Sequence, residues 1–113
     1  MRNEKLASNP IGVVLQFVGA KWKILIINEL LKTELRFAEL KKRIGCTSKV
    51  LTKCLKEMEE DELVVREEDQ RHPNRVEYYL TDIGYTLQPV VTSMQKWGKE
   101  YKKYIKLKNK VQK

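Results

Sequence analysis

Residues 37–61, FAELKKRIGCTSKVLTKCLKEMEED, decide the fold of this chain. Phe37, Leu40 and Ile44 recur at three- and four-residue spacing, which predicts a helix of about two turns with one apolar side. The other side of this helix is basic. Gly45 is expected to end it, because glycine readily adopts the left-handed backbone found just after many helices.

A second, longer helix is predicted after a short turn. Thr47 or Ser48 can cap its start, and the helix should run to about Asp61. Its buried stripe is expected at Leu51, Cys54, Leu55 and Met58. A short helix, a turn of three to four residues containing Gly, and a second capped helix form the helix-turn-helix pattern.

Two more helices are predicted before this pair. Asn9 and Pro10 suit the N-cap and first position of a helix that should end near Gly19. A helix beginning around Lys21 is apolar on nearly every side and is therefore expected at the centre of the core. After a polar break, Leu35 is expected to pair as a very short strand.

The residues after the helix-turn-helix predict a β-hairpin. Leu63–Glu67 and Val76–Leu80 have the composition and alternation of strands, and the polar loop between them is basic at its tip. A hairpin in this place is a wing. The predicted fold is mainly α with a small β-hairpin wing, a winged helix-turn-helix. It should form one domain over residues 1–113, with a core at about 9–105 and a lysine-rich tail at 106–113.

The last helix, which Thr81 should cap, carries a regular apolar seam. Ile83, Leu87, Val90, Met94, Trp97, Tyr101 and Tyr104 alternate spacings of four and three residues, the heptad period of helices that pack along each other. Pro89 is expected to kink or restart this helix.

The seam spans about 32 Å by helical rise, about the width of a small domain. It can pack back on its own domain, but part of it is expected to extend past the core and to meet a second copy together with the first helix. The predicted dimer interface consists of Val14, Phe17, Leu87, Val91, Met94, Trp97, Tyr101 and Tyr104.

The net charge of +8 is distributed unevenly. Residues 96–113 contain eight lysines and one acid and so account for +7, but such tails are more often solvated than specific. Residues 41–56 contain six basic groups and no acid, whereas residues 57–69 contain eight acids and one base. With basic residues again at the hairpin tip, the fold is expected to have one positive face, as binding to a polyanion requires.

The outward side of the second helix of the pair is the predicted DNA contact. Its hydroxyl and ammonium groups can reach phosphates and base edges, although an isolated helix with such a face would more simply be solvated. No Arg or Gln occupies its early exposed positions, so DNA shape and phosphate contacts are expected to carry more of the specificity. The predicted DNA-contacting residues are Arg36, Lys41, Thr47, Ser48, Lys49, Thr52, Lys53, Lys56, Arg71 and Arg75.

Other function classes have little support in the sequence. No Gly-rich phosphate loop, metal-ligand cluster or nucleophile–base pair is present, and His72 has no evident partner, so no enzyme activity, metal or cofactor is expected. No apolar run approaches the ~20 residues that span a bilayer, and no signal peptide is evident, so a cytoplasmic protein is expected. The apolar residues of the tail are committed to the seam, which disfavours binding to a membrane surface. A winged-helix module that binds protein rather than DNA is the alternative function.

The two cysteines, Cys46 and Cys54, are expected to be structural. If both lie on one helix or at its edge they are about 12 Å apart, too far for a disulfide. Cys46 has Arg43 and Lys49 near it in sequence, which leaves an oxidant-sensing role open. Cys54 falls on the buried stripe and is expected to be a small core residue.

Most of the chain, from Gly19 to Trp97, resembles the HxlR family of bacterial winged-helix regulators. The resemblance lies in GAKWK at 19–23, LRFAEL at 35–40, LTKCLKEME at 51–59, RVEYYLT at 75–81 and KWG at 96–98. It implies a homodimer joined by the first and last helices, with the helix-turn-helix and wing on duplex DNA, in keeping with an inverted-repeat operator. The family includes activators and repressors, some of which respond to electrophiles or oxidants. Several redox-sensing members have Cys just before the proline that opens the first helix, where this chain has Asn9, which argues against that type of thiol sensing.

Overall fold

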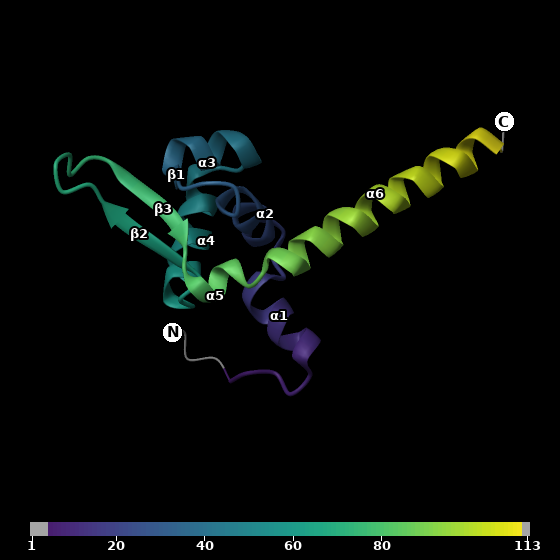
Figure 1. Cartoon of the computed structure of the whole chain (residues 1–113), viewed down its shortest axis with the longest axis horizontal. Helices are drawn as coiled ribbons and strands as arrows, with labels where there is room; N and C mark the ends of the chain where they lie inside the picture. The colour runs from purple at the N-terminus through teal and green to yellow at the C-terminus, as the bar shows by residue number, and fades with distance from the viewer. Residues whose placement is uncertain (1–4, 112–113) are drawn as a thin grey trace.

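Six helices and three strands follow one another in this computed structural model, which describes residues 5–111 (Figure 1). The elements are α1 (Pro10–Val18), α2 (Lys21–Leu30), β1 (Leu35–Arg36), α3 (Phe37–Ile44), α4 (Ser48–Glu60), β2 (Val64–Glu68), β3 (Val76–Leu80), α5 (Asp82–Tyr85) and α6 (Gln88–Val111). This order confirms the predicted winged helix-turn-helix, in which α3 and α4 form the helix pair and β2 and β3 form the wing.

The three strands form an antiparallel sheet in the order β1-β3-β2. The two-residue strand β1 pairs with β3 through Leu35 and Tyr78, so the chain between α2 and α3 is anchored to the wing. The β2–β3 hairpin extends away from the helices at one end of the molecule (Figure 1). The sheet thereby fixes the position of the wing relative to the helix-turn-helix.

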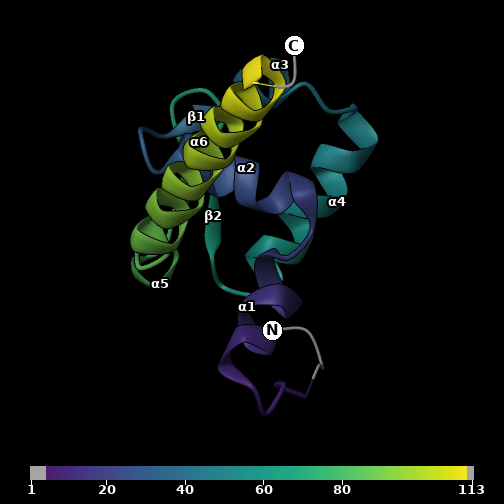
Figure 2. The same cartoon turned by 90° about the vertical axis from the view of Figure 1, so that its right-hand side faces the viewer.

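The core is built around α2, as its apolar composition predicts. Ile26, Ile27 and Leu30 of α2 are fully buried. The predicted stripe of α4 packs into the same cluster, with Leu51 and Met58 fully buried. The two long elements α4 and α6 lie on opposite sides of α2 (Figure 2).

Three helix boundaries follow the predicted caps. The Asn9 side chain accepts a hydrogen bond from the Ile11 N–H at 2.9 Å, with Pro10 opening α1. Gly45 closes α3 in the left-handed region at φ 74°. Thr47 Oγ1 accepts from the Val50 N–H at 3.2 Å, so Thr47, rather than Ser48, caps α4.

The predicted single last helix is wrong in one respect, because Thr81 caps a separate four-residue helix, α5. The Gly84 N–H donates to Thr81 Oγ1 at 3.1 Å. The chain then breaks at residues 86–87 and restarts as α6, with Pro89 at its second position, since proline lacks the N–H that a continuous helix would need. Ile83, the first residue of the predicted seam, therefore lies on α5 rather than on α6.

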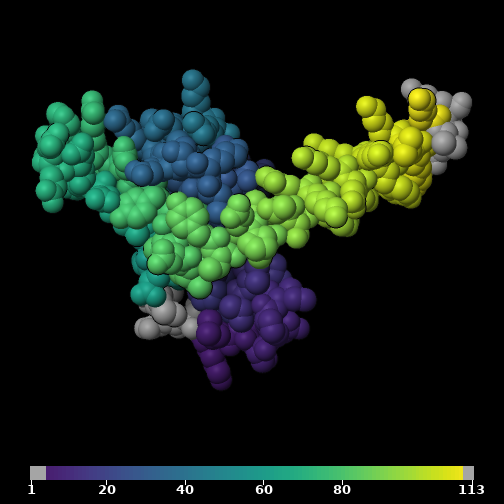
Figure 3. All heavy atoms as spheres, in the orientation of Figure 1, coloured from purple at the N-terminus to yellow at the C-terminus, as the bar shows by residue number. Residues whose placement is uncertain are grey.

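Helix α6 extends well beyond the body of the domain as an arm (Figure 3). The molecule measures 60 × 35 × 24 Å along its principal axes, and the arm accounts for much of the long one. Within residues 5–111 no single helix is both long and apolar enough to cross a membrane, although α1 and α2, bent by 84°, pass that test as a pair. The expectation that the seam extends past the core is confirmed.

Candidate nucleic-acid interface

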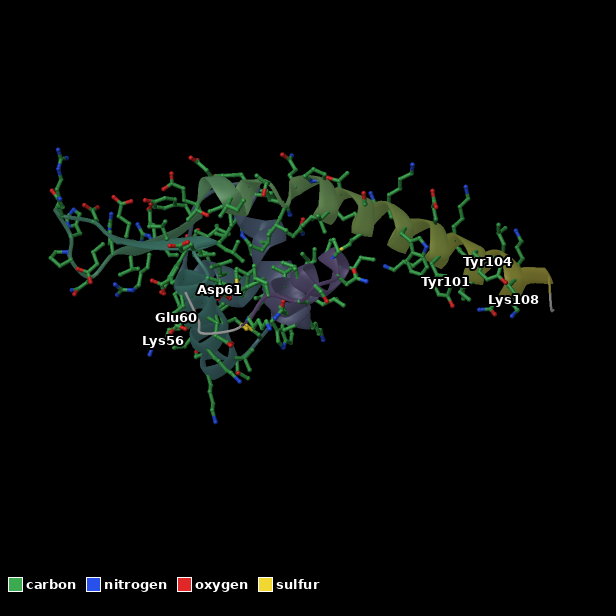
Figure 4. All side chains as sticks on the ribbon, turned by 90° about the horizontal axis from the view of Figure 1, so that it is seen from below. Lys56, Glu60, Asp61, Tyr101, Tyr104 and Lys108 are labelled. Atoms are coloured by element: carbon green, nitrogen blue, oxygen red, sulfur yellow. The ribbon has the colours of Figure 1, made fainter. Side chains whose placement is uncertain are left out.

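The exposed side of α4 carries most of the predicted DNA-contacting residues. The buried stripe fixes the rotation of the helix, because Leu51, Leu55 and Met58 face the core. The exposed positions are Ser48, Lys49, Thr52, Lys53 and Lys56, and Thr47 is exposed at the cap. Figure 4 shows Lys56 and Glu60 on the same outer side of α4.

The lysines of α4 are not neutralised by the chain. Among the ion pairs within residues 5–111, none involves Lys49, Lys53 or Lys56. The acids that end the helix therefore leave these ammonium groups unpaired. Three free cations on one helix face, with hydroxyls between and before them, can bind phosphates over about two helical turns.

The turn before α4 is held rigidly enough to aim the helix. Cys46 lies in this turn and is buried against the core, which pins the chain between α3 and α4. The Gly45 N–H donates to the Lys41 carbonyl at 2.9 Å and closes α3. At the other end of α3, the Arg36 N–H donates to Glu39 Oε1 at 2.9 Å. Both ends of α3 are thus fixed, and so is the path into α4.

A basic groove runs between this helix pair and the wing. It has a volume of about 470 Å³. Its polar lining comes from three arginines, one amide and two hydroxyls, with no acid among the lining residues. The residues that line this basic groove are Arg36, Phe37, Ala38, Thr52, Arg66, Asn74, Arg75, Val76 and Tyr78. A groove of this composition suits one phosphate strand of a duplex.

Arg66 and Asn74 belong to the groove but were absent from the predicted site. Arg66 is the single base in the acidic run 57–69, and its β2 position pairs with Tyr78 on β3. The two-residue alternation of a strand puts Arg66 on the same side as the buried Val64, which faces the helices. This strand alternation was the sequence signal from which Arg66 could have been assigned to the site. Arg66 also forms an ion pair with Glu68 at 3.2 Å, which a bound phosphate would have to replace.

The opposite side of the wing is acidic. A hollow of about 420 Å³ is lined by Glu34, Glu67, Glu68, Asp69, Gln70, Arg71 and Glu77. Glu67 and Glu77 are directly opposite each other in the strand register. A hydrogen bond to Glu77 and the charge of that carboxylate raise the pKa of Glu34 above its usual value. The wing therefore has a mainly basic side and an acidic side, and the two meet where Arg66 pairs with Glu68.

Two residues of the predicted set lie neither on the exposed side of α4 nor in the basic groove. Arg71 lines the acidic hollow, whereas Arg75 lines the basic groove, and the Arg71 backbone N–H donates to Asp69 Oδ1 at 2.9 Å. Lys41 is exposed on α3 outside the groove lining. Arg36, Thr52 and Arg75 are the three predicted residues that the groove brings together.

The surface predicted for dimer contact divides into an exposed and a buried part. Val91 is only 5% exposed and belongs to the core of its own chain, and Phe17 and Leu87 pack against that core. The exposed part is an apolar ridge on α6, made of Met94, Trp97, Tyr101 and Tyr104.

The apolar ridge is ordered within one chain. Trp97 and Tyr101 stack with ring centroids 5.1 Å apart and an interplanar angle of 10°, and Tyr104 follows at 6.1 Å from Tyr101. On α1, Val14 is exposed as predicted, and so are Ile11 and Leu15, which the predicted interface omitted. The sequence signal for these two residues was the apolar composition of α1, in which Gln16 is the one polar side chain.

The helix-turn-helix, the wing and most of α6 match a known protein family. The model of the HxlR-like helix-turn-helix family matches residues 17–106, from within α1 to late in α6. The chain belongs to the HxlR family. It is thus a DNA-binding transcriptional regulator with a winged helix-turn-helix, and the family and its relatives are regulators rather than enzymes.

Individual transcriptional regulators are similar to this chain over most of their own length. The HTH-type transcriptional regulator YdeP of Bacillus subtilis is 37% identical over 112 residues, covering 90% of this chain and 88% of that protein. An HTH-type transcriptional regulator of Halalkalibacterium halodurans is 42% identical over 97 residues, covering 84% and 86%. The reduced form of the redox regulator HypR has a TM-score of 0.80 at 33% identity and covers 87% of this chain and 98% of that one.

Proposed function

We propose that this HxlR-family regulator binds an inverted-repeat operator as a homodimer, with α4 in the major groove and the basic groove on an adjacent phosphate strand. The observation that carries the proposal is the row of unpaired lysines on α4 beside a groove with three arginines and no acid. A two-fold axis would place the two α4 helices in successive major grooves, about 34–36 Å apart.

The residues proposed to contact DNA fall into three groups. Ser48, Lys49 and Lys53 face the major groove from the first turns of α4, and Thr47 and Lys56 flank them. Arg36, Thr52, Arg66, Asn74 and Arg75 hold the phosphate strand in the basic groove. Lys41 and Arg71 contribute only to the surrounding positive potential, because both lie outside the groove. Few of these side chains give bidentate base contacts, so sequence-dependent DNA shape supplies much of the selectivity.

The homodimer is proposed to form through the apolar ridge of α6 and the exposed apolar residues of α1. Trp97 is 64% exposed, Ile11 69% and Leu15 62%, values that are uncommon for several large apolar side chains on two neighbouring helices of one monomer. Heptad spacing along the ridge suits packing against another helix. Covering this surface with a second copy removes it from water.

A thiol switch is not part of the proposal, although HypR is a redox regulator. Cys46 and Cys54 are both free and buried. Burial, the largest cause, raises the pKa of the Cys54 thiol and so lowers its thiolate fraction. The position before Pro10 is Asn9, which has no redox chemistry.

The test begins with selection of bound sequences from random duplex DNA. Enriched inverted repeats are expected, and the absence of any enriched sequence would favour a protein-binding module instead. Lys49→Ala with Lys53→Ala should then weaken operator binding and reduce the slope of log K against log salt by about 0.9 for each lost phosphate contact. Lys5→Ala with Lys32→Ala removes the same net charge away from α4, the basic groove and the apolar ridge, and should leave the slope unchanged. Equal operator affinity of the α4 variant and wild type at every salt concentration would show that α4 is not the contact.

A further inference from the structure

One charged surface of α6 is not used by operator binding or by dimer formation. Successive helical residues are about 100° apart, so residues three and four apart share a side. On the side of α6 away from the apolar ridge, this spacing collects one uninterrupted group of lysines. This lysine face consists of Lys96, Lys99, Lys102, Lys103, Lys106 and Lys110, all exposed.

No acid neutralises the lysine face. Among the ion pairs within the described range 5–111, none involves these six lysines. Glu100 is the one acid between residues 88 and 111. At about 100° per residue, it lies at the edge of the lysine face. Like charges at three- and four-residue spacing destabilise a helix. The lysine face therefore carries unpaired positive charge, and the repulsion among these lysines opposes formation of the helix.

The lysine face points away from the proposed operator-binding surface. Helix α6 and helix α4 lie on opposite sides of α2 (Figure 2). Figure 4 shows Tyr101 and Tyr104 on the side of α6 that faces α1 and α4, with nitrogen-tipped side chains rising from the other side. A duplex held by α4 is thus out of reach of the lysine face of the same chain.

We infer that the lysine face binds a second DNA duplex without regard to its sequence, so that an operator-bound dimer can hold two duplexes together. The inference rests on the proposed function, because the first duplex is the operator on α4. From Lys96 to Lys110 the row is about 21 Å long by helical rise, and duplex DNA presents about 12 phosphates over that length. A straight row of flexible ammonium groups matches a straight polyanion, and such contacts carry no base readout.

Duplex DNA fits this surface better than an anionic membrane does. A helix that binds a bilayer inserts the apolar side next to its lysines, and in the proposed dimer that side is covered by the second copy. Operator binding also keeps the protein among other DNA segments, whereas it brings the lysine face no closer to a lipid surface.

The experiment measures capture of a second duplex. Operator duplex is fixed to beads and saturated with full-length protein, and a fluorescent duplex of unrelated sequence is added in solution. Wild type should retain the fluorescent duplex at low salt and release it as salt rises. Lys103→Gln with Lys106→Gln should retain about tenfold less while occupying the operator as fully as wild type, since two phosphate contacts are lost. The matched control, Lys5→Gln with Lys32→Gln, removes the same net charge away from both the lysine face and the apolar ridge, and should retain as much as wild type.

Three results would overturn the inference. They are no second duplex on operator-bound wild type, equal retention by the Lys103/Lys106 variant, and retention of phosphatidylserine vesicles in place of DNA. Failure of the proposed function gives a different pattern. In that case wild type does not occupy the operator beads, yet loss of free-duplex binding in the Lys103/Lys106 variant, and not in Lys49→Ala with Lys53→Ala, would still locate DNA on α6.

Discussion

At the scale of single residues, Lys23 is a charged side chain buried in the apolar core. Lys23 is 5% exposed on the central helix α2, and its Nζ lies 3.5 Å from Oε1 of Glu57 on α4. A buried ammonium is costly unless it is paired, and so is the carboxylate that faces it. The pair links the core helix to the recognition helix, so its loss should affect both stability and the orientation of α4.

Lys23→Met keeps the apolar stem but leaves Glu57 without this cation. We expect a loss of about 1–3 kcal/mol of unfolding free energy, below the range for fully buried pairs because Glu57 is partly exposed. Urea denaturation monitored by circular dichroism measures the change. The control is Lys32→Met, which breaks a shorter pair with Glu29 at 2.9 Å whose lysine side chain is 59% exposed, and it should cost less than about 1 kcal/mol. Equal losses in the two variants would mean that burial of the Lys23 pair is unimportant.

The acidic side of the wing makes a pH-dependent prediction at Glu34. Its pKa is raised by the hydrogen bond and charge of Glu77 and further by the charge of Glu67. A raised folded-state pKa favours the protonated form, so stability from this carboxyl is present below its ordinary pKa of 4.5 and is lost as pH rises through the raised value.

Glu34→Gln imitates the protonated carboxyl at every pH. It should therefore raise the Tm at pH 7 and leave it nearly unchanged at pH 4, where wild type is itself protonated at this position. Thermal unfolding of both proteins at the two pH values measures the difference. An increase of the same size at both values would show that repulsion among these carboxylates is not its cause.

At the scale of elements, the junction between the wing and α6 depends on close contact at Gly84. A Cβ at this residue would lie 2.4 Å from the Leu63 carbonyl oxygen and 3.2 Å from the Leu80 Cβ. The first of these atoms belongs to the backbone at the start of the hairpin, which cannot easily move aside. Helix α5 sits this close because Thr81 Oγ1 donates to the Glu62 carbonyl and accepts from the Gly84 N–H.

Gly84→Ala should force α5 away from the hairpin. We expect about 1–3 kcal/mol of destabilisation, as for overpacked sites generally, seen as a lower urea midpoint. Gln88→Ala, at an exposed position one turn later, should change stability by less than about 0.5 kcal/mol. If Gly84→Ala is as stable as wild type, the close approach to Leu63 is not required.

This junction also marks the limit of prediction from sequence. Helices α1 to α4 and the wing strands follow from local signals: Asn9-Pro10, Gly45, the Thr47 cap and the alternation over Val76–Leu80. The α5–α6 break does not, because Thr81 and Pro89 predict a cap and a restart but not a complete stop between them. We attribute that stop to the close approach of Gly84 to Leu63, which precedes β2 and is far from Gly84 in sequence. The basic groove was likewise only partly predicted, since Arg66 joins it through the pairing of β2 with β3.

At the scale of the whole molecule, the arm formed by α6 is hard to explain for a monomer. Its apolar ridge carries the stacked rings of Trp97 and Tyr101, and Trp97 is 64% exposed. Burial of such surface is the main favourable term in protein association. The predicted heptad pattern covers the exposed residues of the arm, whereas Val91, which was predicted for the interface but lies outside that pattern, is buried in its own chain.

Trp97→Asp should convert the proposed dimer into monomers. The carboxylate stays hydrated in a monomer, where the position is exposed, but would be desolvated beneath a second copy. Sedimentation equilibrium should give the chain mass of 13.4 kDa for the variant and twice that for wild type. Tyr85→Asp, at a 45% exposed position on α5 away from the apolar ridge, should remain dimeric. A dimeric Trp97→Asp protein would exclude the ridge from the interface. A monomeric one that still holds a single half-site, but no longer gains affinity from the second, would show that the ridge sets the spacing of the two recognition helices.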